Sequence, residues 1–428
     1  MRQNWDTLER MRELARLGPL SEAFAYAPEL GCLLRHLDPA LWRRFKSADP
    51  RWRPAQADDL AFLHYCEGLP EIDLPLLLCA AVGDIATWQR ELDSSLVCER
   101  SMITPDAHRP AGSWPMAQVP AIWLAPGPTS SRARVYAPSA CLDYPLAPPE
   151  LGWAREMLEG RPQGECTPAT DEQIARVHPL RLLRDIDRFA ASGGGHFDPE
   201  TPVIRETPAA IRAAAGAIAK AVRDGLGDRG KRVGICLARP GSHHAGVDRP
   251  MGTCLINNLA VGATEALSQG VERVAIVDVD AHHGNGTQEI FCADPRVLAA
   301  SIHQFPFYPG TGLQSADPGI LNRPVRTDAG QSFAEEWTAV LGALVAHRPG
   351  LILVEASFDA HELDGISELG WRDEDYQRVF HDLRSLSLGL GVPLVLEVGA
   401  AATQVAFRRG LAATLHGLAQ AEAEADAR

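Results

Sequence analysis

Short apolar segments alternate with helical segments from about residue 132 onward, and this alternation limits the folds that the chain can adopt. Five apolar runs are typical of buried strands: residues 232–237, 273–279, 297–303, 351–356 and 393–398. The segments between them are typical of helices: 208–226, 257–269, 332–347 and 372–390. Fully apolar strands separated by helices predict an α/β fold with a central parallel sheet covered on both faces. In such sheets the functional residues gather just beyond the carboxyl ends of the strands.

The first 125 residues differ from the rest of the chain. They hold six of the nine tryptophans and are typical of short amphipathic helices, with no cluster of residues that demands chemistry. A Pro/Gly/Ser-rich stretch at 126–131 then breaks any regular element. We therefore predict an N-terminal helical region at 1–125, a linker at 126–131 and a catalytic domain at 132–428. Whether the N-terminal region covers a pocket or mediates assembly into a homo-oligomer stays open.

Composition excludes several classes of function. The chain carries 41 Lys and Arg against 55 Asp and Glu, a formal net charge of −14, with no block of basic residues. We therefore expect no nucleic-acid partner, whereas a basic peptide or a polyamine would be attracted. The nine cysteines include no C-x-x-C pair, which argues against a disulfide framework or a cysteine zinc finger. Because neither a signal peptide nor an apolar run of membrane length occurs, we expect a cytoplasmic protein with no membrane contact.

Acidic and histidine residues crowd the end of the predicted strand 273–279. Asp278, Asp280 and His282 occupy alternate positions, and alternate side chains of an extended segment point to the same side. Carboxylates together with an imidazole suit a divalent metal such as zinc or iron(II). A single Asp at this place would be explained by capping of the next helix. Two Asp and two His within six residues are costly to bury unpaired, so we predict a metal site.

Two further polar clusters follow predicted strands. His243 and His244 come after the strand 232–237, in a loop with Gly and Pro, which favours a catalytic pair over solvated surface residues. Asp359 comes after the strand 351–356 and can supply a second carboxylate, which gives the metal three protein ligands and room for water. An aromatic loop that contains Tyr308 follows the strand 297–303.

These motifs resemble the histone deacetylase family of zinc amidohydrolases, which has the arginase/deacetylase fold, over roughly residues 132 to 420. Four blocks occur in family order: Arg-Pro-Gly-Ser-His243-His244-Ala, Asp278-Val-Asp280-Ala-His282-His283-Gly-Asn285-Gly-Thr, Phe-Tyr308-Pro-Gly-Thr-Gly and Phe-Asp359-Ala. The resemblance implies a three-layer fold around a parallel sheet. It also implies a zinc-dependent enzyme in which metal-bound water attacks an acyl-amide, such as an acyl-lysine, an acylpolyamine or a related small amide.

The resemblance further implies a role for each site residue. The zinc ligands would be Asp280, His282 and Asp359. The catalytic residues would be His244 as general base and later acid, His243 as its electrostatic partner, Asp278 to orient His243, and Asn285 to orient His244. The family also binds a structural potassium ion beside the zinc. Its ligands here would be oxygens of Asp278, Asp280, His282, Ser301 and Ile302.

The sequence departs from the family at the residue that stabilises the oxyanion. Where the family has Glu-Gly-Gly-Tyr, and the Tyr hydroxyl donates to the tetrahedral intermediate, this chain has Glu-Val-Gly-Ala400. Losing one oxyanion donor typically costs on the order of 10²–10³ in turnover. We therefore expect low activity on acetyl-lysine. Tyr308 and His361 are the two candidates to supply the missing donor.

A second departure lies in the predicted substrate channel. The family has an aromatic residue after the glycine of this segment, and here Gly252 is followed by Thr253. The facing wall is kept as Tyr308. Since Thr253 and Ala400 both remove ring volume, we expect a pocket wider than one shaped for acetyl-lysine.

Two other functions share parts of the pattern that indicates a zinc-dependent deacylase. The loss of the Tyr favours a catalytically weak or inactive zinc domain that binds an acyl-amide or peptide, but a pure binding domain has no need of the retained base. A ureohydrolase of the same fold would hold two manganese ions and needs an Asp-x-Asp strand end. The sequence there is Ser357-Phe358-Asp359, so the ureohydrolase is rejected.

Overall fold

The computed structural model describes residues 132–315, 317–326 and 333–427. The predicted N-terminal region 1–125 and linker 126–131 lie outside these ranges, so the division into domains stays a prediction. Apart from the loop Phe305–Thr311, the described residues form one compact unit. Within the described part of the chain, no helix combines the length and the apolar character that a membrane span requires.

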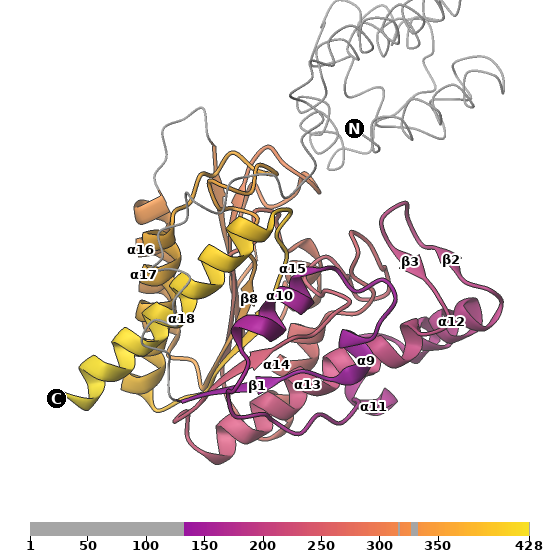
Figure 1. The fold of residues 1–428 in the computed structure, drawn as a ribbon, viewed down its shortest axis with the longest axis horizontal. Helices are drawn as coiled ribbons and strands as arrows, with labels where there is room; N and C mark the ends of the chain where they lie inside the picture. The colour runs from indigo at the N-terminus through magenta and orange to yellow at the C-terminus, as the bar shows by residue number, and fades with distance from the viewer. Residues whose placement is uncertain (1–131, 316, 327–332, 428) are drawn as a thin grey trace, which may run out of the picture. The chain divides into compact units, whose positions relative to one another are not determined.

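A seven-stranded sheet forms the centre of this unit, and all neighbouring strands in it run parallel (Figure 1). In spatial order the strands are β1 (Ala133–Tyr136), β4 (Val233–Cys236), β9 (Leu394–Val398), β8 (Leu351–Ala356), β5 (Val274–Asp278), β6 (Val297–Gln304) and β7 (Ile320–Val325). The five inner strands are buried at every residue. A sheet with both faces covered has no solvent-facing side, which is why these strands are apolar except near their carboxyl ends.

Helices cover the sheet on both sides (Figure 1). Helices α13 (Thr207–Gly227) and α14 (Asn258–Ser268) pack against each other and against the inner strands. Helices α16 (Phe333–His347) and α17 (Asp373–Leu390) also pack on strands, and α18 (Gln404–Asp426) lies along α17. The smaller elements are α9 (Ser139–Leu142), α10 (Glu150–Met157), α11 (Asp171–Ile174), α12 (Leu180–Ala191), α15 (Asn285–Phe291) and the hairpin of β2 (Gly195–His196) and β3 (Pro202–Val203). The predicted three-layer α/β fold is confirmed.

Local signals define where the helices start and stop. Asn257 caps α14 by accepting a hydrogen bond from the backbone N–H of Ala260, and Thr403 caps α18 in the same way. Helix α17 ends at Gly391, whose φ of 68° is left-handed and is readily adopted by glycine. The caps at Asn257 and Thr403 begin α14 and α18 after the loops that follow β4 and β9.

All five predicted strands and all four predicted helices are present, each within one residue at either end. The two edge strands and the C-terminal helix α18 were not predicted. Strand β7 contains Asn322, Arg323 and Pro324 and is only partly buried, so it lacks the apolar run that marks the inner strands. Proline is tolerated there because an edge strand leaves one row of backbone groups unpaired.

Candidate active site

Four polar residues stand side by side at the carboxyl end of the sheet. Glu397 on β9 pairs in register with Glu355 on β8, which pairs with Asp278 on β5, which in turn pairs with Ser301 on β6. All four side chains are buried. The loops that follow these strands and β4 carry the remaining residues that the sequence analysis singled out.

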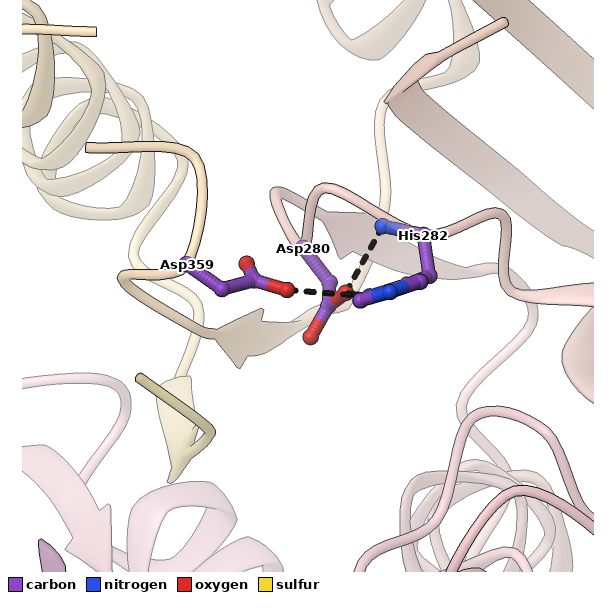
Figure 2. Close-up of side chains that lie close together, drawn as sticks. All are labelled: Asp280, His282 and Asp359. Atoms are coloured by element: carbon purple, nitrogen blue, oxygen red, sulfur yellow. Dashed lines mark hydrogen bonds and ion pairs between the residues drawn. The ribbon is translucent and has the colours of Figure 1, made fainter. Parts of the chain in front are cut away.

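Asp280, His282 and Asp359 form a group that could hold a metal ion. One ligand atom from each residue lies within 4.8 Å of the others. His282 Nδ1 lies 2.8 Å from Asp280 Oδ1 and 2.9 Å from Asp359 Oδ2, as Figure 2 shows. Asp280 and Asp359 are buried and His282 is partly buried. The loop after β5 therefore meets the loop after β8, as expected for neighbouring parallel strands.

Backbone groups hold the two carboxylates in place. The N–H of Ala281 donates to Asp359 Oδ1 at 2.9 Å, and the N–H of His282 donates to Asp280 Oδ1 at 2.8 Å. Asp359 Oδ2 is buried, and its one neighbouring donor among the described residues is Nδ1 of His282, 2.9 Å away. A buried carboxylate oxygen with so few partners is costly unless a cation binds it.

The charges of this group suit a divalent cation. Burial opposes the charged form of His282, but hydrogen bonds to Asp280 and Asp359 raise its pKa to about 10. Burial and the negative charge of Asp280 raise the pKa of Asp359 to about 7. With both carboxylates ionised, the group carries more negative charge than one imidazolium balances. Two carboxylates and one imidazole are a donor set that fits zinc.

His243 and His244 lie beside this group. Their ring centroids are 3.9 Å apart, and the centroid of His244 is 5.9 Å from that of His282. His243 Nδ1 donates to Asp278 Oδ2 at 3.0 Å, and His244 Nδ1 donates to Asn285 Oδ1 at 2.7 Å. Because both acceptors are oxygens without a proton to give, each imidazole carries a proton on Nδ1.

The two imidazoles experience opposite electrostatic environments. Burial disfavours the charged form of both. The negative charges of Asp278 and Asp280 outweigh burial at His243 and raise its pKa well above its usual range. At His244 burial acts together with the positive charges of His243 and His282, and its pKa is well below its usual range. A pair with separated pKa values suits one neutral base next to one charged partner.

Gly284 gives the Asp278 carboxylate its space. A Cβ atom at Gly284 would lie 2.3 Å from Asp278 Oδ2, the oxygen that accepts from His243. Any side chain at this position would displace the carboxylate. The glycine of the His283-Gly284-Asn285 stretch is therefore needed for the contact between Asp278 and His243.

Gly252 and Thr253 form a tight turn with positive φ at both residues, 55° and 67°. A left-handed backbone is a genuine outlier for a β-branched residue such as threonine. The turn is held by Asp198, whose carboxylate accepts from the Gly252 N–H, and by Thr201, whose hydroxyl accepts from the Thr253 N–H. The side chain of Thr253 is exposed.

Ala400 lies just beyond β9 and is half-buried. Its N–H donates to Ser357 Oγ at 3.1 Å, and its carbonyl accepts from the Phe358 N–H at 2.7 Å. The backbone of Ala400 is therefore fixed, and its N–H already has an acceptor. Neither its side chain nor its backbone N–H replaces the hydroxyl donor of a tyrosine.

Of the two candidates for this donor, His361 has neither ring nitrogen available. His361 Nε2 donates to Asp373 Oδ1 at 3.0 Å, and Nδ1 accepts from the Leu363 N–H at 3.0 Å, with the side chain fully buried. Both ring nitrogens are thus engaged in holding the loop. Tyr308 lies in the loop Phe305–Thr311, outside the compact unit, so its role stays a prediction.

Three buried residues beside the histidine pair, Glu355, Glu397 and Asn258, had no predicted role. Ser242 Oγ contacts both Glu355 and Glu397, and Asn258 donates to Glu397. A glutamate that ends an otherwise apolar strand, as in Leu-Ile-Leu-Val-Glu355 and Leu-Val-Leu-Glu397, is the signal that could have identified them.

Comparison with known proteins finds one family whose matched range contains the residues described above. A family model for the histone deacetylase domain matches residues 151–406. The probable deacetylase of Methanothermobacter thermautotrophicus is 34% identical over 256 residues, 56% of this chain and 76% of that protein. Acetylpolyamine amidohydrolase 1 of Pseudomonas aeruginosa is 33% identical over 264 residues, 58% of this chain and 72% of that protein.

Solved structures agree with the sequence match. The crystal structure of the HDA15 HD domain is similar with a TM-score of 0.58 and 28% identity, over 68% of this chain and 90% of that chain. The acetylpolyamine aminohydrolase from Burkholderia pseudomallei shares the fold with a TM-score of 0.58 at 24% identity, over 68% of this chain and 99% of that chain. Because the family model covers more than half of the chain and includes every residue of the metal group and the histidine pair, the chain belongs to the histone deacetylase family of the arginase/deacetylase superfamily.

Proposed function

We propose that this protein is a zinc-dependent deacylase that hydrolyses an acyl-amide. The observation that supports it most is the position of the histidine pair, 5.9 Å between the ring centroids of His244 and His282, beside a group of two carboxylates and one imidazole. Asp280, His282 and Asp359 would hold the zinc ion. A zinc ion bound there would supply Lewis acidity toward the acyl carbonyl and the attacking water.

His244 would move the proton in this reaction. Because the Nδ1–H of His244 donates a hydrogen bond to Asn285 Oδ1, the lone pair of the neutral imidazole is on Nε2. Nε2 would take a proton from the attacking water as the carbon–oxygen bond forms. The same proton would then pass to the leaving nitrogen as the carbon–nitrogen bond breaks, which releases an amine and a carboxylate. His243, charged and bonded to Asp278, would stabilise the negative charge that develops nearby.

A structural potassium ion belongs to the same proposal. A small pocket is lined by Asp278 and Ser301, two of the predicted potassium ligands, and by Gly284 and Asn322, among other residues. Carboxylate and hydroxyl oxygens are suitable ligands for such a cation. The ion would stiffen the loop that carries Asp280 and His282.

Ala400 supports a second candidate, a zinc domain that binds an acyl-amide or a peptide with little or no turnover. The Ala400 N–H donates to Ser357, so this part of the chain offers no oxyanion donor. The retained base and its partner Asn285 support the enzyme instead. We take acyl-lysine, acylpolyamine and small amides as the substrate classes to compare, since a deacetylase and an acetylpolyamine amidohydrolase are both among the relatives.

Hydrolysis of a panel of acyl-amides by the zinc-loaded full chain tests the two candidates. The panel runs from acetyl, trifluoroacetyl and long acyl groups on lysine peptides to acylated polyamines. A deacylase gives turnover that a chelator removes, that His244→Ala abolishes and that His381→Ala retains, since His381 lies on α17 outside the site. Bound zinc without turnover, even on the activated trifluoroacetyl amide, would favour the binding domain.

A further inference from the structure

Two buried glutamates lie next to the histidine pair and take no part in the reaction described above. Glu355 and Glu397 are register partners on β8 and β9, and only 2% and 1% of their surfaces are exposed. Two ionised carboxylates that are buried side by side would repel each other strongly. Their hydrogen bonds indicate how the chain accommodates them.

Ser242 connects the two carboxyl groups. Its Oγ lies 3.1 Å from Glu355 Oε2 and 2.8 Å from Glu397 Oε2. A hydroxyl has one proton and can donate to only one of these oxygens. The other contact is a hydrogen bond only if the carboxyl group itself brings the proton.

Asn258 shows which glutamate is ionised. Its Nδ2 donates to Glu397 Oε1 at 2.8 Å, so with Ser242 the Glu397 carboxyl accepts at both oxygens. Glu355 then carries the proton and donates it to Ser242. The result is a chain of hydrogen bonds that runs from Glu355 through Ser242 to Glu397.

The electrostatic environment agrees with this assignment. Burial and the charge of Glu397 raise the pKa of Glu355 well above its usual range. Burial raises the pKa of Glu397 to about 7, although Asn258 and Ser242 oppose the change. The other ionisable groups around the pair are Asp278 on β5, Arg239 and His243 on the loop after β4, Cys236 on β4, Cys141 on α9 and Cys254 shortly before α14.

The chain of hydrogen bonds fastens the loop that carries the histidine pair. Ser242 directly precedes His243, and Asn258 Nδ2 also donates to the carbonyl of Pro240 at 3.0 Å. The loop is thus held at two points to the carboxyl groups of β8 and β9. Gly399 leaves room for this, because a Cβ atom there would lie 2.8 Å from Glu355 Oε1.

We propose that Glu355 and Glu397 hold a single proton between them and that this pair, through Ser242, positions His243 and His244. Glu355, Glu397 and Ser242 are positioning residues, since none of them contacts the metal group described above. The inference rests on the proposed function only for its kinetic consequence.

Infrared difference spectroscopy of the metal-free full chain tests the shared proton. Glu355→Gln keeps a donor toward Ser242 but has no carboxyl group. We expect the protonated-carboxyl band at neutral pH to have the same intensity in the wild type and in Ser387→Ala, and to be smaller by one carboxyl group in Glu355→Gln, because Asp359 with its pKa of about 7 also contributes to it. Ser387 is the matched control because it is a buried serine on α17 that bonds the Val392 carbonyl. The same band in Glu355→Gln as in the wild type would overturn the proposal.

The ring resonances of the histidines test the positioning role without any turnover. Ser242→Ala should shift the signals of His243 and His244, whereas Ser387→Ala and Glu355→Gln should leave them in place. Unchanged signals in a folded Ser242→Ala protein would overturn this role. If Ser242→Ala does not fold, Glu397→Gln takes its place, since the amide disturbs the acceptor of Ser242 and should shift the same signals.

Kinetics add a third measurement if the chain is a deacylase. Ser242→Ala should lower kcat about tenfold at unchanged KM, the effect of about one buried hydrogen bond. A wild-type kcat in a folded Ser242→Ala protein would count against the positioning role, and a chain without deacylase activity would leave the spectroscopic results decisive.

Discussion

The Nδ1 atom of His244 lies 2.7 Å from the amide oxygen of Asn285, and this contact selects the tautomer of the proposed base. Without an acceptor at Nδ1, the imidazole would be free to carry its proton on Nε2 or to rotate. We therefore expect Asn285→Ala to lower kcat about tenfold or more while KM changes little. Steady-state kinetics on the preferred amide measures both constants. A folded Asn285→Ala protein with the wild-type kcat would show that another group orients His244.

The inner strands and the motifs that follow them in the sequence could be predicted because each is defined by a short stretch of consecutive residues. An apolar run such as Leu351–Ala356 marks a buried strand by itself, and the residues after it must lie at the same edge as those after its neighbours. That reasoning was sufficient to expect Asp359 near Asp280. It could not predict the edge strand β7, whose burial alternates and whose sequence contains a proline.

Contacts that depend on side-chain direction could not be predicted from spacing. His361 stands two residues after Asp359, yet its ring turns to Asp373 on α17 and takes up a buried structural position. Ser242 likewise gives no sign in the sequence that it bonds residues on two distant strands. Such contacts depend on register between strands and on helix packing, which motifs do not encode.

Ala400 offers a gain-of-function prediction. Its backbone is held by Ser357 and Phe358, so a larger side chain changes the pocket without moving the strand end. Ala400→Tyr should raise turnover of acetyl-lysine by about 10²–10³, the usual contribution of one oxyanion donor. Ala400→Phe is the matched control, since it adds the ring without the hydroxyl and should give no such rise. Equal effects of both variants would assign the change to pocket width.

Metal binding should stabilise the chain because Asp280 and Asp359 bring two carboxylates to one imidazole. At a zinc concentration one hundred times Kd, a single site adds about 2.7 kcal/mol to the free energy of unfolding. We expect zinc to raise the Tm, a chelator to reverse the rise, and Asp359→Asn to abolish it. Differential scanning calorimetry measures all three.

Asp364→Asn provides the control for this measurement. Asp364 is also buried, but its carboxylate accepts from the N–H groups of Ala402 and Thr403 and is not part of the metal group. The variant should lower the Tm and still respond to zinc. A zinc response that survives in Asp359→Asn would show that the metal binds elsewhere.

Glu265 on α14 makes stability depend on pH far from the active site. Only 5% of its surface is exposed, and its carboxylate lies 2.6 Å from Arg176 Nη1 and 3.0 Å from Arg223 Nη1. Burial raises its pKa, but hydrogen bonds from Gln173, Arg223 and Arg176 outweigh it and lower the pKa to about 2. Since the folded pKa lies below the unfolded one, the ionised form stabilises the fold above about pH 4.5, and this stabilisation is lost as the pH falls toward 2.

Replacement of Glu265 should therefore lower the free energy of unfolding at neutral pH and have little effect on it in acid. We expect Glu265→Gln to lower the free energy of unfolding by about 2 kcal/mol at pH 7, with the difference shrinking below about pH 4.5. Urea unfolding of the metal-free chain across this range measures it. Glu172→Gln, which changes an exposed acid on α11, should give the wild-type curve at every pH. A constant offset between Glu265→Gln and the wild type down to pH 3 would mean that the loss comes from packing, because only the ion pairs with Arg176 and Arg223 disappear when the carboxylate is protonated.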